Sequence, residues 1–218
     1  MMSMTYLVFI LVIVTCSFAK PIAANRVVSP FLVQHESALV KRTFYNLDDV
    51  KKADRRKFLE EAHKEAVDMA RTALLHMKDK KYKHILRTWF GDRHDAGSKV
   101  EKVLKAYVGD NKKSQGSTVL SQVKVWDDDY NKNKAGTRFC DIVDENGKKG
   151  LAYFKFKNGE PAMHFCDRFF ERKGKADFLK NKCGSIAEHI NTDSTTRKYR
   201  GANVFHEFMH FPQVGEKG

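Results

Sequence analysis

The sequence lacks a long apolar run beyond its N-terminal region, and it contains no N-x-Ser/Thr sequon, no internal repeat and no low-complexity tract. Since a membrane-spanning helix needs about 18 consecutive apolar residues, we expect no span in the body of the chain. The missing sequon argues against N-glycosylation. No nucleic-acid-binding motif is present either, which argues against nucleic acid as a partner.

Residues 1–19 are predicted to be a secretory signal peptide. The apolar core from Tyr6 to Val14 is followed by Ser17-Phe18-Ala19, which fits the small-x-small rule for cleavage after Ala19, and Ala24 is a second candidate. The alternative is a retained membrane anchor, for which this core is short. We therefore expect an extracellular protein without a membrane anchor after signal removal.

The dibasic pair Lys41-Arg42 precedes a change in composition and could mark a processing site. Residues 20–42 would then be a propeptide ending at Arg42, and residues 43–218 the functional domain. The alternative is an ordinary basic dipeptide in a chain with 40 Lys and Arg residues.

The chain is strongly basic, with a formal net charge of +13. Removing residues 1–42 leaves 36 basic and 26 acidic residues, a net charge of +10, spread along the sequence. Such a surface favours anionic extracellular partners, such as acidic proteins or cell-wall polymers.

Three of the four cysteines lie outside the predicted signal peptide: Cys140, Cys166 and Cys183. Export permits disulfides, and an odd count leaves one thiol free or paired with another chain. A bond between Cys166 and Cys183 closes the shorter loop and would stabilise the fold by about 3 kcal/mol.

Hydrophobic periodicity predicts helices in the first half of the domain. Apolar residues at three- and four-residue steps indicate a long amphipathic helix over 53–77, and shorter helices are expected within 81–92 and 98–110. His63 and His76 fall in the long helix, where an isolated histidine is typical of a surface or core position.

The middle of the chain has the shorter period of strands. A strand is expected at 117–126, followed by three antiparallel strands at 137–143, 151–156 and from 162 to an exit at Asp167, joined at Asn146-Gly147 and Asn158-Gly159. A final helix follows, which Pro212 ends close to His210. The expected class is α+β, with N-terminal helices, a small antiparallel sheet and a C-terminal helix.

The final helix contains the stretch HEFMH, at residues 206–210. His206 and His210 are four residues apart, so they lie on one helical face and can bind one zinc ion. Glu207 beside them can act as general base toward a zinc-activated water. Phe205, Phe208 and Met209 would bury the back of the helix. The alternative is a helix with two surface histidines and an incidental glutamate.

The stretch HEFMHFPQV resembles the His-Glu-x-x-His-x-Pro-x-Val segment of the deuterolysins, fungal secreted zinc endopeptidases of the aspzincin group. The layout of residues 54–214 is also similar to that of the related lysine-specific metallo-endopeptidases. The resemblance implies a zincin-like fold and a zinc-dependent endopeptidase acting on polypeptides, with His206 and His210 as ligands and Glu207 as catalytic base. It also implies a disulfide from Cys166 to Cys183, and an absent partner for Cys140.

The third zinc ligand of that family is an aspartate in a Gly-Thr-x-Asp segment, and none follows His210 in this sequence. Sequence beyond Gly218 could supply it, and Glu216 and Asp193 are candidate substitutes within the chain. Two other functions therefore stay open: a non-catalytic zinc-binding or surface-interaction protein, and a small cationic effector that binds no metal.

Overall fold

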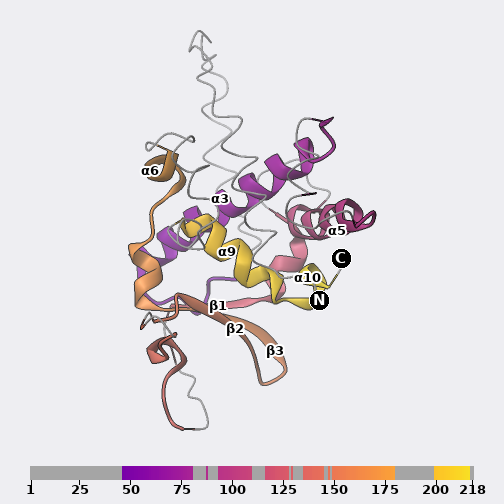
Figure 1. Ribbon diagram of the computed structural model, residues 1–218. Helices are drawn as coiled ribbons and strands as arrows, with labels where there is room; N and C mark the ends of the chain where they lie inside the picture. Colours follow the sequence, from indigo (N-terminus) through magenta and orange to yellow (C-terminus); the bar gives the residue numbers. More distant parts are fainter. Residues whose placement is uncertain are drawn as a thin grey trace.

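The computed structural model describes residues 46–80, 87, 93–109, 116–127, 129, 135–144, 147, 149–179 and 199–216. The predicted signal peptide, the segment 20–42 and the cleavage positions Ala19 and Arg42 lie outside these ranges, as do Cys183 and most of the predicted helix at 81–92. The described elements mix helices with one small sheet, which confirms the α+β class (Figure 1).

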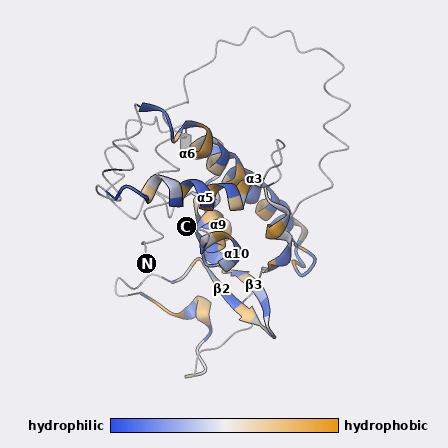
Figure 2. Ribbon diagram, turned by 90° about the vertical axis from the view of Figure 1, so that its right-hand side faces the viewer, coloured by the Kyte–Doolittle hydropathy of each residue, from blue (hydrophilic) through white to orange (hydrophobic). Residues whose placement is uncertain are grey.

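Two predicted helices are confirmed. Helix α3 runs from Ala53 to His76 and buries a small-residue face that includes Ala62, Ala66, Ala70 and Ala73. These methyl groups let neighbouring helices approach closely. Helix α5 spans Ala96–Val108 and packs on α3 through Val100, Leu104 and Tyr107, among others. Figure 2 shows polar and apolar residues on different sides of these helices, as amphipathic helices require.

The sheet has three described strands in the order β1-β3-β2: β1 Lys124–Trp126, β2 Ala152–Lys157 and β3 Glu160–Phe165. Strands β2 and β3 form the predicted hairpin, turning at Asn158-Gly159, where both residues have positive φ. Met163 lies in register with Val125 and Phe154, and these side chains face the helices.

The prediction of a wholly antiparallel sheet is wrong. Strand β1 pairs parallel to β3, because the long connection over 127–151 carries the chain past the position of β3 to the other edge of the sheet. There β2 starts antiparallel to β1, and β3 then returns between the two strands. Residues 137–143 form no strand. They contain the 3₁₀ helix η4, Phe139–Asp141, and an isolated bridge from Val143 to Lys149. Half of 117–126 likewise forms the 3₁₀ helix η3, Thr118–Gln122, and the predicted strand is confined to Lys124–Trp126.

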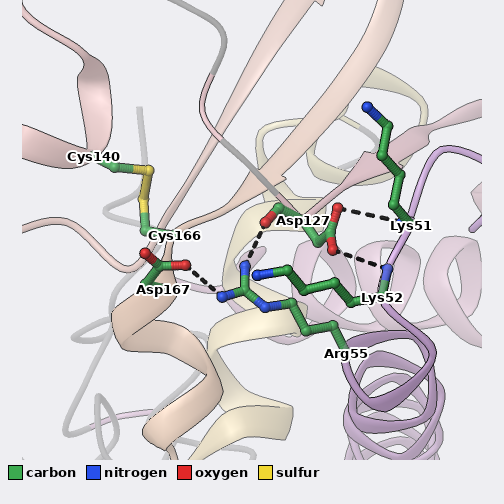
Figure 3. Close-up of polar contacts among 7 residues, drawn as sticks. All are labelled: Lys51, Lys52, Arg55, Asp127, Cys140, Cys166 and Asp167. Carbon is green, nitrogen blue, oxygen red and sulfur yellow. Dashed lines mark hydrogen bonds and ion pairs between the residues drawn. A yellow bond between two sulfur atoms is a disulfide. The ribbon is translucent and has the colours of Figure 1, made fainter.

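The predicted Cys166–Cys183 disulfide is also wrong, because Cys166 is bonded to Cys140 (Figure 3). Their Cα atoms lie 5.5 Å apart, although 26 residues separate them in sequence. Loop length favoured Cys183, but the fold places η4 beside the exit of β3. Asp129 helps to place it, since its carboxylate accepts a hydrogen bond of 2.6 Å from the Cys140 backbone N–H.

Beyond β3 the chain forms the 3₁₀ helix η5, Asp167–Glu171, and the short helix α6, Lys175–Leu179. The last two described helices are α9, Arg200–Met209, and α10, Pro212–Gly215. Helix α9 lies against α3 and also contacts β2, so it sits between the helical layer and the sheet (Figure 1). Within the described part of the chain, no helix has the length and apolar content that crossing a membrane requires.

Candidate metal centre

Helix α9 carries the HEFMH stretch, and its apolar side forms part of the core. Phe205 and Phe208 are fully buried and pack edge-on against Tyr107 of α5, with ring centroids 4.8 and 5.5 Å apart. The helix ends at Met209, because Pro212 requires extended backbone at Phe211, where φ is −81° and ψ is 117°. The predicted apolar stripe and the predicted end of the helix are both found.

His206 and His210 lie next to each other on one side of α9. Their ring centroids are 5.2 Å apart and their planes are nearly perpendicular, at 82°. His210 follows the last helical residue but keeps helical backbone angles, with φ −76° and ψ −13°, so the i, i+4 relationship survives. Although His210 is exposed at the surface, partial desolvation by the surrounding protein lowers its pKa, which favours the neutral imidazole that a metal requires.

Glu207 points toward the interior, with only 8% of its surface exposed. Burial raises the pKa of this carboxyl to about 8, because a charged carboxylate loses its hydration there. In the metal-free protein the group is therefore protonated at neutral pH. A raised carboxyl pKa on the helix that carries two adjacent imidazoles is the kind of perturbation that functional sites concentrate.

The described residues do not supply a third ligand. They contain no cluster of three or more His, Cys, Asp or Glu side chains arranged to hold a metal. Glu216, a candidate from the sequence, caps the end of α10 and does not complete such a cluster with His206 and His210. Asp193 lies outside the described residues.

Two other histidines are structural, as their positions suggest. His63 is buried in the core, with ring centroids 6.4 Å from Tyr107 and 6.0 Å from Phe208. His164 of β3 is fully buried and stacked between Trp126 and Tyr153 of the neighbouring strands. These contacts explain why neither histidine joins the candidate centre.

Strand β2 borders the candidate centre. It forms one edge of the three described strands and contacts α9. Phe154 of β2 packs near Phe211, with centroids 6.0 Å apart, while Phe156 is about half exposed. Close to the helix that carries the histidines, β2 therefore has an exposed apolar side chain and an edge that pairs with no further strand among those described.

Sequence reasoning missed the residues that hold α9 in place. Arg200, in its first turn, forms ion pairs with Glu61 and Glu65 of α3. Arg200 and Glu65 are 135 residues apart in the chain, so no local pattern could have connected them. An arginine at the start of a helix, where the helix dipole disfavours a cation, was the available signal.

Scans against protein-family models, curated proteins and solved structures find no match for this chain. The residues of α9 and their surroundings therefore carry the information on function.

Proposed function

We propose that this protein is a secreted zinc-dependent metalloendopeptidase, in which His206 and His210 bind the metal and Glu207 is the general base. The observation that supports this most directly is the pair of adjacent imidazoles on a rigidly packed helix, with a largely buried carboxyl between them in sequence. Two neutral nitrogen donors suit zinc, and a catalytic site would take a third protein ligand besides. The zincin-like fold is part of this proposal.

When bound, zinc would polarise the peptide carbonyl and make a water molecule more acidic. Glu207 would accept the proton from that water and then donate it to the nitrogen of the leaving amine. The raised pKa of Glu207 fits this exchange, because a carboxyl with a pKa of about 8 holds a transferred proton readily. A cation beside it would also lower that pKa and favour the ionised base at the start of the reaction.

The substrate would be a polypeptide in extended conformation. An extended peptide can add to the open edge of a sheet through backbone hydrogen bonds, and β2 offers such an edge among the described strands beside α9. The positive net charge of +13 favours acidic polypeptides or anionic extracellular surfaces. Secretion is part of the proposal, and the Cys140–Cys166 disulfide is compatible with it.

The decisive experiment compares the wild-type protein, recovered from the medium of a secreting host, with Glu207→Gln and the control Glu60→Gln. We expect zinc in all three proteins and hydrolysis of an unstructured acidic peptide by the wild type and the control. The Glu207→Gln substitution should reduce hydrolysis by at least about 100-fold, since it removes the general base. Equal hydrolysis by all three proteins would contradict the assignment of Glu207.

A second candidate function is a non-catalytic zinc-binding or surface-interaction protein derived from the same fold. It is favoured by the two-histidine set, because the described residues contain no third donor beside it. For this candidate we expect zinc to bind the wild type and Glu207→Gln alike, with no hydrolysis by either. The same experiment therefore separates the two candidates.

A further inference from the structure

The N-terminal end of α9 is joined to α3 by the guanidinium of Arg200. Its Nε donates to Oε2 of Glu65 at 3.0 Å and its Nη2 donates to Oε1 of Glu65 at 2.9 Å, so the contact is bidentate. Nη2 also lies 2.9 Å from Oε2 of Glu61. Arg200 and Glu65 are 12% and 14% exposed, whereas Glu61 is 48% exposed. The central pair is thus largely removed from water.

A third chain segment meets this ion pair. The backbone N–H of Lys175 donates to Oε1 of Glu65 at 2.9 Å, and the backbone N–H of Arg200 donates to the carbonyl of Lys173 at 3.1 Å. Between them, Gly174 passes so close that an added Cβ would lie 2.9 Å from Nη2 of Arg200. The guanidinium therefore links α3, the segment 173–175 and α9.

The position of Arg200 is costly without this pair. A cation in the first turn of a helix opposes the helix dipole, and a poorly solvated guanidinium needs a partner. The planar fork of arginine matches a carboxylate in two bonds, which fixes direction as well as distance. The Phe58 ring, 4.7 Å from Cζ of Arg200, supports the guanidinium.

The direction of α9 has to be fixed by Arg200 because the next residue in the contact with α3 is a glycine, Gly201. Gly201 lets α9 approach α3 so closely that an added Cβ would lie 3.0 Å from Cβ of Glu65. Glycine has no side chain to fix the direction of α9 at its first turn, and the packed rings of Phe205 and Phe208 lie a turn or more further along the helix. With a helix radius of roughly 5–6 Å including side chains, a rotation of 20° would move an imidazole by about 2 Å. A functional site tolerates about 0.5 Å.

We propose that Arg200 is a positioning residue that orients α9, so that the rings of His206 and His210 face one ion together. His206 lies about 9 Å along the helix from Arg200, at 1.5 Å per residue, so the effect acts through the helix rather than by contact. The zinc part of this inference rests on the proposed function, whereas the ring orientation can be measured without metal.

The test compares Arg200→Lys, which keeps the charge but loses the fork, with Arg55→Lys. Arg55 serves as the control because it also lies in the first turn of a helix, α3, and pairs with a carboxylate. Its side chain is 16% exposed, and that of its partner Asp167 is 87% exposed. The side-chain NMR resonances of both histidine rings are recorded in the metal-free proteins, and zinc affinity is measured by competition with a chromogenic chelator.

We expect the ring resonances of His206 and His210 to move in Arg200→Lys and to stay in place in Arg55→Lys. Zinc affinity should fall about tenfold in the first variant and by no more than about twofold in the second, as for other residues that orient metal ligands. Unmoved resonances in Arg200→Lys, or equal losses of affinity in both variants, would overturn the positioning role. If the ring resonances move in Arg200→Lys but the wild-type protein binds no zinc, the positioning role is supported and the proposed function is refuted.

If Arg200→Lys does not fold, Glu61→Gln provides the second variant. It removes only the more exposed arm of the contact and leaves the bidentate pair with Glu65 in place. We expect a smaller movement of the same ring resonances. Resonances identical to those of the wild type would then count against the inference.

Discussion

The carboxylate of Asp127 accepts a hydrogen bond from the backbone N–H of Lys52, the residue at which helix α3 begins. Lys52 is the N-cap residue of α3, and no side-chain hydrogen bond caps the helix. Asp127, buried just after β1, accepts from the N–H of Lys52 at 3.4 Å and of Lys51 at 3.5 Å (Figure 3). Arg55 donates to the Asp127 carbonyl at 2.6 Å, so the sheet and the longest helix are joined at this point.

Replacing Asp127 with alanine should lower the free energy of unfolding by about 1–2 kcal/mol, because the backbone N–H groups of Lys51 and Lys52 would lose their carboxylate acceptor. Urea denaturation measures this loss, with Asp48→Ala as the control, since Asp48 is exposed. Equal stability of the two variants would show that these hydrogen bonds contribute nothing.

The disulfide gives a second prediction. Peptide mapping of the unreduced protein should recover Cys140 linked to Cys166, and Cys140→Ser should lower the free energy of unfolding by about 3–4 kcal/mol for a loop of this length. A peptide that links Cys166 to Cys183 would contradict the structure. Stability unchanged by Cys140→Ser would show that the bond does not constrain the unfolded chain.

Local patterns in the sequence predicted α3, α5, the β2–β3 hairpin and the final helix, because each depends on periodicity or on turn residues close in the chain. The adjacency of His206 and His210 follows from the same local geometry, since residues at i and i+4 share a helical face. These predictions needed no knowledge of how the elements pack.

Most of the errors concern contacts between distant segments. The parallel pairing of β1, the choice of Cys140 as the partner of Cys166 and the Arg200–Glu65 ion pair depend on how the chain returns to itself. The strand predicted at 137–143 was also displaced by tertiary contacts, since Asp129 and the disulfide hold Cys140 in a 3₁₀ turn. The composition of the chain and the spacing of its residues do not show which distant segments will meet in the fold.

The buried carboxyl of Glu207 should make the metal-free protein less stable as pH rises. Its pKa is 4.5 in the unfolded chain and about 8 in the folded one, so between these values the folded state holds a proton that the unfolded state has released. The stability is therefore fully present below pH 4.5 and declines toward pH 8, by as much as roughly 1 kcal/mol per pH unit.

The measurement is urea denaturation at several pH values with a chelator present, comparing the wild type with Glu207→Gln. The amide does not titrate. The free energy of unfolding of the wild type should therefore fall relative to that of Glu207→Gln as the pH rises across this window. His210 has its pKa lowered by partial desolvation and therefore acts oppositely, losing stability as pH falls below 6.5, but it is present in both proteins. A pH-independent difference would show that Glu207 does not titrate as its burial requires.

Zinc should stabilise the folded protein through His206 and His210. A ligand that binds only the folded state adds about 2.7 kcal/mol to the free energy of unfolding when its free concentration is 100 times its dissociation constant. A chelator that removes the zinc removes this stabilisation. Thermal unfolding with and without added zinc measures it in the wild type, in the double variant His206→Ala/His210→Ala and in the control His94→Ala, whose histidine is exposed. The control should respond as the wild type does and the double variant should not respond. A melting temperature insensitive to zinc and chelator in all three would favour the remaining possibility, a cationic extracellular protein that binds no metal.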